Sequence, residues 1–255
     1  MSYDGHPTLF SQISLSKGNI ALYGRTILAA EQMCQALGVR LDFATAEEFL
    51  AINEANRSSW LPLASFFHPA FSTLTSKNSI FILGRDRSGE VVACQACRFY
   101  DWTGTNFKDE CESLRFWYDD PVSMRNPGER ATVSALAARG TTGKVAYSGA
   151  AWYRRDYRGK GLVEYLPRLS RAYAAGVWGT ETTITMMAEN NVKKGVFPRN
   201  GYRNIEMDVD VVNSQGGTIR FAYIWTKDEE MEEDLEEFLF NLSEEARVAR
   251  RSSVG

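Results

Sequence analysis

The sequence is poor in the residues that most often bind metals or form disulfides. It holds two histidines and four cysteines in 255 residues. Cys94 and Cys97 form a C-x-x-C pattern, but they fall within a predicted strand, where side chains three positions apart point to opposite faces. The two histidines, His6 and His68, are too few to complete a typical zinc site. We therefore expect neither a redox pair nor a metal site.

Long apolar runs and a strong charge of one sign are also missing. No stretch approaches the ~20 apolar residues that cross a bilayer, and the first twenty residues show no basic segment leading into an apolar one. The formal net charge is -3, whereas nucleic-acid binding needs a concentrated basic surface. We expect a cytoplasmic protein that binds neither membranes nor nucleic acid.

What remains has the composition of a folded globular chain. Hydrophobic residues make up 44% of the sequence and charged residues 24%, and both values are ordinary for such proteins. A chain of this length can bury one sizeable core and carry additions to it. We therefore expect one main domain with extensions.

The most informative stretch combines a strand, a basic turn and a helix. The run Val145–Tyr153 is apolar and β-prone, and Gly159 and Gly161 follow it in a turn with Arg158 and Lys160, before a helical pattern. Backbone N–H groups at a helix start bind anions, and glycines allow an anion to approach the chain closely. The turn is thus either a phosphate or pyrophosphate cradle or an ordinary solvated turn.

Two common phosphate motifs do not match. The segment Ala138–Val145 lacks the first glycine of a Walker A loop and ends in valine where a metal-binding hydroxyl is required. A dinucleotide fingerprint would need glycine at position 164, which is Glu164.

The turn resembles the coenzyme A loop of the GNAT superfamily of N-acetyltransferases, whose pattern is [QR]-x-x-G-x-[GA]. Arg158 and Gly161 match this pattern, and Val163 replaces its last small residue. The segment Asn190–Tyr202 resembles the asparagine, aromatic and glycine-aromatic pattern that follows the next strand in the family, with Phe197 in the place usually held by tyrosine.

The resemblance implies a mixed α/β (α+β) fold of the GNAT-like acyl-CoA N-acyltransferase type. The two motifs cover about 145–202, and compatible elements on either side extend the resemblance. The predicted domains are an N-terminal extension with one helix at 1–38, the N-acyltransferase domain at 39–226 with an insertion at 103–144, and a C-terminal amphipathic helix and tail at 227–255.

Periodicity predicts further elements along the chain. We expect helices at 23–37, 60–67, 107–118 and 131–138, a strand at 39–43, and hairpins of 79–83 with 91–97 and of 206–212 with 219–225. The insertion is rich in aromatic residues, which could form a wall of the acceptor site or a contact in a homodimer.

The resemblance also assigns residues to the cofactor. The main chain of the strand end would serve the pantetheine arm, and the N–H groups of the turn would hold the pyrophosphate. Asn190 would reach the coenzyme arm or the incoming amine, or would instead satisfy a backbone group at the strand end. The expected cofactor-binding residues are Trp152, Tyr153, Arg155, Arg158, Gly159, Lys160, Gly161, Leu162, Val163, Asn190 and Phe197.

The catalytic groups depart from the family pattern. Family members often place a glutamate on the strand before the turn, and 145–153 contains none. The candidate bases are therefore Glu189, Asp101, Glu110 and Glu112. Phenylalanine at 197 cannot protonate the leaving thiolate, so Tyr153 or Tyr202 would have to do so. The expected catalytic residues are Asn190, Glu189 and Tyr153.

These features predict an acyl-CoA-dependent N-acyltransferase. It would transfer acetyl from acetyl-CoA to a primary amine of a small molecule or peptide by direct attack in a ternary complex, and no metal would take part. Two alternatives remain, namely a non-catalytic or regulatory CoA-binding protein of this fold and a transferase that uses a longer acyl donor.

Overall fold

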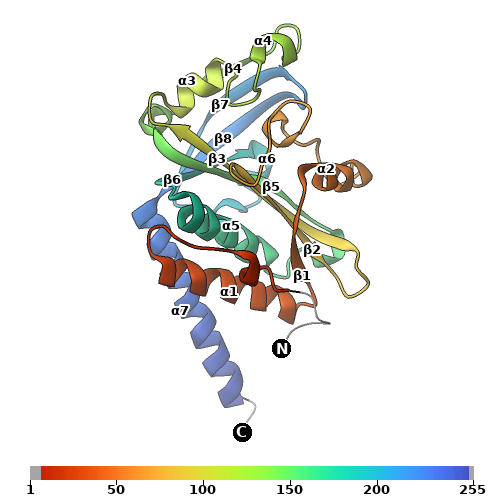
Figure 1. Ribbon diagram of the computed structural model, residues 1–255, viewed down its shortest axis with the longest axis vertical. Coiled ribbons are helices and arrows are strands. Elements are labelled where there is room, and N and C mark those ends of the chain that lie inside the picture. The colour runs from red at the N-terminus through yellow and green to blue at the C-terminus, as the bar shows by residue number, and fades with distance from the viewer. Residues whose placement is uncertain (1–6, 253–255) are drawn as a thin grey trace.

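The computed structural model describes residues 7–252 of the chain, so His6 lies outside the described residues. The chain forms an eight-stranded sheet with the order β1-β2-β3-β5-β6-β8-β7-β4 (Figure 1). The strands are β1 (Arg40–Ala44), β2 (Ser79–Arg85), β3 (Val91–Trp102), β4 (Arg130–Val133), β5 (Gly143–Tyr153), β6 (Thr182–Ala188), β7 (Asn204–Ser214) and β8 (Gly217–Lys227).

Helices cover both faces of this sheet. They are α1 (Ile20–Ala36), α2 (Ala46–Ala55), α3 (Phe107–Glu112), α4 (Pro121–Met124), α5 (Leu162–Trp178), α6 (Glu189–Lys193) and α7 (Asp228–Ser252). Short 3-10 turns lie at Phe10–Gln12, Ser65–Phe67, Leu136–Gly140, Arg155–Tyr157 and Phe197–Asn200. Among the helices within residues 7–252, none is long and apolar enough to span a membrane.

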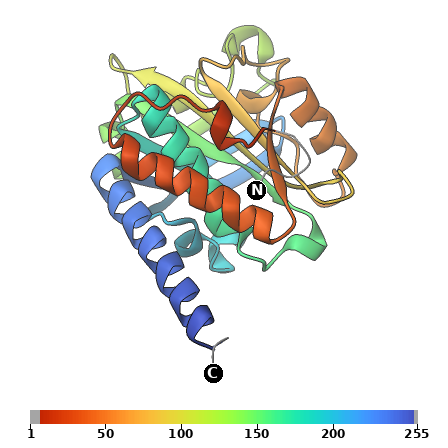
Figure 2. The same cartoon turned by 60° about the horizontal axis from the view of Figure 1, so that its bottom comes forward.

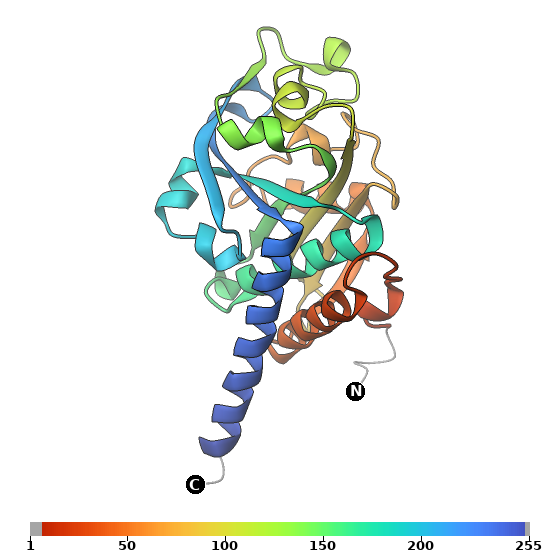
Figure 3. The ribbon, with the colours of Figure 1, turned by 90° about the vertical axis from the view of Figure 1, so that its left-hand side faces the viewer.

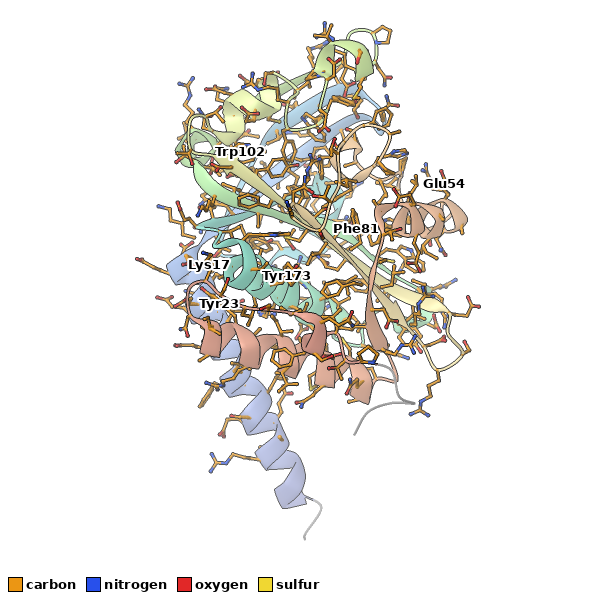
Figure 4. All side chains as sticks on the ribbon, viewed as in Figure 1. Lys17, Tyr23, Glu54, Phe81, Trp102 and Tyr173 are labelled. Carbon is orange, nitrogen blue, oxygen red and sulfur yellow. The ribbon has the colours of Figure 1, made fainter. Side chains whose placement is uncertain are left out.

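Two hydrophobic clusters lie on opposite faces of the sheet. One joins α1 and α5 to the sheet through buried residues such as Ile27, Leu166 and Ile82, and Figure 2 shows α1 beside α5. The other is aromatic and includes Trp102 and Phe116. Figure 4 places Trp102 near the end of β3. Because β2 and β3 are covered on both faces, nearly all of their residues are buried.

The helix that follows the glycine turn is amphipathic. Leu162, Leu166 and Leu169 lie at helical spacing and are buried, which fixes α5 against the sheet. The helix continues through Pro167, although proline removes one backbone donor from the ladder. Ser170 Oγ donates a hydrogen bond to the Pro167 carbonyl at 2.9 Å.

The C-terminal helix packs against the core along its first half. Met231 and Leu235 are buried in the cluster of α1 and α5, and Asp234 pairs with Arg168 and Arg171 of α5. Tyr23 of α1 donates to Glu232 at 2.7 Å. The second half of α7 projects beyond the rest of the chain (Figure 3).

Several predicted elements are confirmed with small shifts of their ends. The first helix, the first strand, both hairpins and the C-terminal helix are present. Thr45 caps α2, because its side chain accepts from the N–H of Glu48. The Glu48 carboxylate, however, pairs with Arg85 at 2.6 Å and does not complete the reciprocal cap.

Three predicted helices are wrong in whole or in part. Segment 60–67 contains only the 3-10 turn at its end, because Pro62 cannot donate within a helix. The helix predicted at 107–118 ends at Glu112, and Leu114 has a positive φ of 65°. Segment 131–138 is no α-helix, since its first half belongs to β4, which pairs with β7 at the sheet edge.

The insertion is therefore an integral part of the sheet and of the core. Its strand β4 extends the sheet, and its aromatic residues belong to the aromatic core. Phe107, Phe116, Trp117 and Tyr118 are each 4% exposed or less. These four rings are thus engaged inside the chain, which leaves them unsuited to a contact in a homodimer.

Candidate active site

The site lies where the parallel strands β5 and β6 separate. They pair only from Val145 with Thr182 to Tyr147 with Ile184. β5 continues to Tyr153 and β6 to Ala188 without further pairing between them. Backbone groups beyond this pairing are available to a ligand, since such groups need a partner when buried, except the N–H of Met186, which donates to the Tyr147 hydroxyl.

A bulge marks the open part of β5. Trp152 pairs with Cys94 and Gly149 pairs with Ala96, so an advance of three residues along β5 corresponds to one of two residues along β3. Ala150 has a φ of 50°, in the left-handed region that non-glycine residues seldom adopt. Bulges of this kind redirect the chain and are frequent beside active sites. Here the bulge leaves Ala150 and Ala151, which line the cavity, without register partners on β3.

A cavity of about 620 Å³ occupies this opening. It runs from the glycine turn to the loop after α2, and it passes the bulge and Asn191 of α6. Its lining includes Ser59 to Phe67, Gln95, Trp117, Tyr147 to Tyr153, Tyr157 to Gly159, Gly161 to Val163, Pro167, Thr185 to Ala188, Asn191, Lys194 to Val196, Arg199, Asn200, Tyr202, Ser214 to Gly216, Ile219 and Phe221.

The glycine turn leaves the start of α5 open. Gly159 and Gly161 have φ values of 79° and 88°, which glycine adopts without strain. Gly161 is the N-cap, and within the described residues no side chain caps this helix. By contrast, α1 and α3 are capped by the side chains of Asn19 and Asn106. The start of α5 can therefore donate its free N–H groups to an anion.

The basic residues of the turn have different partners. Arg154 is paired with Asp86 and Asp156, both at contact distances below 3.0 Å. Arg158 donates through Nε to the carbonyl oxygen of Tyr153 at 3.0 Å and lines the cavity. Lys160 lies over the ring of Tyr157 at 4.3 Å. Arg158 is thus the cation of the turn that faces the cavity.

The predicted cofactor residues divide into two groups. Trp152, Tyr153, Arg158, Gly159, Gly161, Leu162 and Val163 line the cavity. Arg155, Lys160, Asn190 and Phe197 are not among its lining residues. Phe197 instead packs against the small cluster of Tyr202, Ala222 and Ile224.

The predicted catalytic residues are not brought together. Glu189 is paired with Lys193 at 2.8 Å, which lowers the pKa of its carboxyl group and makes it a weaker base. Asn190 is exposed at the start of α6. Tyr153 lines the cavity, but its hydroxyl donates to the carbonyl oxygen of Leu162 at 3.4 Å, and burial raises its pKa.

The remaining candidate bases lie outside the cavity lining. Asp101 accepts from Thr103 at 2.6 Å, and this bond lowers the pKa of its carboxyl group. Glu110 is paired with Arg115, and Glu112 with Lys108. Each of these carboxylates has a local structural partner.

Sequence reasoning missed a buried polar group beneath the bulge. Gln95 Nε2 donates to Ser148 Oγ at 3.0 Å, and Ser148 and Ser170 hydroxyls lie 2.8 Å apart. The Gln95 Oε1 atom is buried and has no hydrogen-bond partner among the described residues. A glutamine inside the apolar run of β3 was the available signal, because buried polar groups usually serve a network or a ligand.

Tyr202 belongs to the same region. Its ring lies under the Arg171 guanidinium at 4.6 Å, and its side chain lines the cavity. Burial raises the pKa of its hydroxyl, and the charge of Arg171 opposes that rise. Tyr202 therefore brings a buried, neutral hydroxyl group to the wall of the cavity. Within the described residues, no cluster of three or more histidine, cysteine, aspartate or glutamate side chains could hold a metal ion.

The chain path is similar to those of several solved acetyltransferases. NAA60 from Arabidopsis thaliana, in complex with a bisubstrate analogue, matches with a TM-score of 0.47 and 11% identity over 74% of this chain and 97% of that chain. Spermidine N-acetyltransferase from Vibrio cholerae matches with a TM-score of 0.45 and 8% identity over 76% of this chain and 95% of that chain. Aminoglycoside acetyltransferase AAC(6')-Ib, in complex with coenzyme A and kanamycin, matches with a TM-score of 0.43 and 13% identity over 76% of this chain and 98% of that chain.

No protein-family model matches the sequence, and none of the curated proteins compared with it does. The sheet itself tests the predicted architecture. Within the described residues β5 and β6 are the one parallel pair of neighbouring strands, and the glycine turn and α5 connect them, which is the arrangement of strand, turn and helix that the motif resemblance implies. The chain therefore has the GNAT-like acyl-CoA N-acyltransferase fold.

Proposed function

We propose that the protein is an acyl-CoA-dependent N-acyltransferase that uses acetyl-CoA as donor. The main observation in support of this proposal is the cavity between the diverging strands, which is continuous with the uncapped start of α5. The phosphates of a cofactor would bind at the uncapped start of α5, and the narrow arm of the same cofactor would lie between the two strands. The residues proposed to bind it are Trp152, Tyr153, Arg158 and the backbone of Gly159 to Val163.

Coenzyme A would bring the activated acyl group, and the chain would orient it. The N–H groups of Leu162 and Val163 would donate to the pyrophosphate, with Arg158 beside them. Backbone groups of the bulge at Ala150 and Ala151 would meet the pantetheine end, since the register pairs neither residue with β3. An N–H group there would stabilise the oxyanion that develops on the thioester carbonyl.

Tyr202 is our candidate for the proton donor to the thiolate, in place of Tyr153. Tyr202 lines the cavity, and its buried hydroxyl has no partner within hydrogen-bond geometry among the described residues, whereas that of Tyr153 donates to the carbonyl of Leu162. Positioning of donor and acceptor would supply much of the remaining acceleration. The domain boundaries at 1–38, 39–226 and 227–255 stay part of this proposal.

Binding of coenzyme A tests the cradle directly. Calorimetric titration of the Gly159→Glu variant should show no measurable affinity, because the added carboxylate would lie at the proposed anion site, where a Cβ meets nothing within 4 Å. Gly179→Glu is the control, since Gly179 also has a positive φ, of 69°, and lies at the other end of α5, outside the cavity lining. Equal loss in both variants, or none in Gly159→Glu, would refute the cradle.

Turnover separates an enzyme from a non-catalytic CoA-binding protein. Release of free thiol from acetyl-CoA in the presence of a panel of amines should exceed the rate without protein. Tight binding of coenzyme A with no release for any amine would support the non-catalytic alternative. Faster release from octanoyl-CoA than from acetyl-CoA would support the longer acyl donor.

A further inference from the structure

The two ends of the cavity differ in chemistry. At the glycine turn and the segment after α6, the charged side chains that line it are those of Arg158, Lys194 and Arg199, which are all cationic. At the other end, the loop from Ser59 to Phe67 closes over the strands from the aromatic face of the sheet. If coenzyme A occupies the cationic end, as proposed above, the acceptor must approach through the second end.

Aromatic rings build the wall of that second end. Trp60 stacks on Trp152 with ring centroids 5.5 Å apart and planes 16° apart. Phe66 lies 4.6 Å from Tyr147 and 5.4 Å from Trp117, measured between ring centroids. These rings come from the loop, from β5 and from the insertion, so three separate segments converge on one apolar surface. Such rings favour flat apolar partners.

The rim of the same end is apolar as well. Leu61 lines the cavity and is 70% exposed, so its side chain lies at the surface beside the aromatic wall. An apolar ligand in this end of the cavity would cover it. The exposed rim and the buried wall thus favour the same class of ligand.

The apolar wall favours an acceptor without a positive charge. An alkylammonium ion, with a pKa near about 10, would have to give up its hydration among the aromatic rings, where no charged side chain of the described residues lines the cavity. An amine that is neutral at pH 7 avoids this cost. It also needs no base before it attacks the thioester.

We propose that the acceptor is an aromatic amine whose nitrogen is uncharged at neutral pH. The nitrogen lone pair forms the new C–N bond and the thioester C–S bond breaks. One proton leaves the nitrogen, and the coenzyme thiolate takes up one proton, so the products are the aromatic amide and free coenzyme A. This inference rests on the proposed transferase function.

A matched pair of amines tests the proposal. 4-Methylaniline and 4-methylcyclohexylamine have similar size, but the first is neutral and the second cationic at neutral pH. With acetyl-CoA as donor, kcat/KM divided by the uncatalysed rate constant should be at least tenfold higher for 4-methylaniline. Spermidine, a flexible polycation, should be turned over more slowly than either.

A charge added at the rim provides the second measurement. Leu61→Glu should raise kcat/KM for 4-methylcyclohexylamine severalfold and leave that for 4-methylaniline within twofold. Leu136→Glu is the matched control, since Leu136 is 88% exposed and lies outside the cavity lining. Both positions are on the surface, so both variants should fold.

The outcomes separate the two proposals. Preference for spermidine or 4-methylcyclohexylamine in the unmodified protein would overturn the aromatic acceptor and leave the transferase function standing. Binding of coenzyme A with no transfer to any amine would overturn both. An equal change of kcat/KM for 4-methylcyclohexylamine in the Leu61 and Leu136 variants would show that the acceptor does not bind at this end of the cavity.

Discussion

The backbone N–H of Met186 on β6 donates a hydrogen bond to the hydroxyl of Tyr147 on β5 at 3.2 Å. Tyr147 pairs with Ile184 in the last step of the parallel ladder. Its side chain thus bridges the two strands at the point where the backbone pairing stops. This contact gives the first separated N–H of β6 a partner and holds the base of the cavity in place.

Gly149 makes room for this bridge, and enlarging it should disturb the site. A Cβ atom at Gly149 would lie 2.6 Å from Cε1 of Tyr147. We expect Gly149→Ala to lower the free energy of unfolding by about 1–3 kcal/mol, because the ring must move. Urea denaturation would measure it. In Gly140→Ala, where a Cβ meets nothing within 4 Å, a loss of the same size would contradict the explanation.

Removal of the Tyr202 hydroxyl should slow the transfer and spare binding. In Tyr202→Phe we expect kcat to fall at least about tenfold, since a positioned proton donor contributes that much or more. The KM for acetyl-CoA should stay unchanged. Steady-state kinetics across a range of pH would measure both parameters.

Tyr153→Phe is the comparison for Tyr202→Phe. The Tyr153 hydroxyl bonds to a backbone carbonyl, so its loss should leave kcat nearly unchanged. A larger fall of kcat in this variant than in Tyr202→Phe would return the role of proton donor to Tyr153.

Asp234 should be the main electrostatic anchor of α7. Arg171 is fully buried and Arg168 is 11% exposed, and both pair with Asp234. Asp234→Ala leaves two guanidinium groups without their carboxylate, which should cost about 3–5 kcal/mol of unfolding free energy. Glu233→Ala breaks an exposed pair with Arg203 and should cost less than about 1 kcal/mol. Similar losses in the two variants, measured by urea denaturation, would refute the anchor.

Asp228 should make the stability of the chain depend on pH. Burial raises the pKa of its carboxyl group, and the nearby charge of Glu232 raises it further. A carboxyl group with a raised pKa in the folded state stabilises the fold at low pH, and this stability is lost as the pH rises through the raised pKa.

The Asp228→Asn variant should therefore have a higher Tm than the unmodified protein at neutral pH, and the difference should shrink as the pH falls below the unfolded-state pKa of about 4. Thermal unfolding over that pH range would measure it. Glu229→Gln, at an exposed neighbouring position, is the control. A Tm gain that stays constant with pH would show that charge at Asp228 is not the cause.

The sequence by itself determined the main strands, the glycine turn and the helix that follows it. The apolar runs of β2, β3 and β5, the glycines at 159 and 161, and the leucine spacing of α5 are local patterns, and each produced the predicted element. The glycine turn was recognisable because few other residues adopt its positive φ values. Local patterns thus predicted the strand, the glycine turn and the helix, and the motif resemblance predicted the fold and the proposed anion cradle.

Tertiary structure alone decided which side chains meet. Glu189 and Asn190 matched a motif, yet a salt bridge with Lys193 and exposure on α6 keep them from the cavity lining. Gln95 and Tyr202, from segments far apart in the chain, lie at the cavity instead. Segment 131–138 looked helical, but pairing with β7 made half of it a strand. Contacts between distant segments override weak local preference, because burial and strand pairing contribute more free energy than propensity.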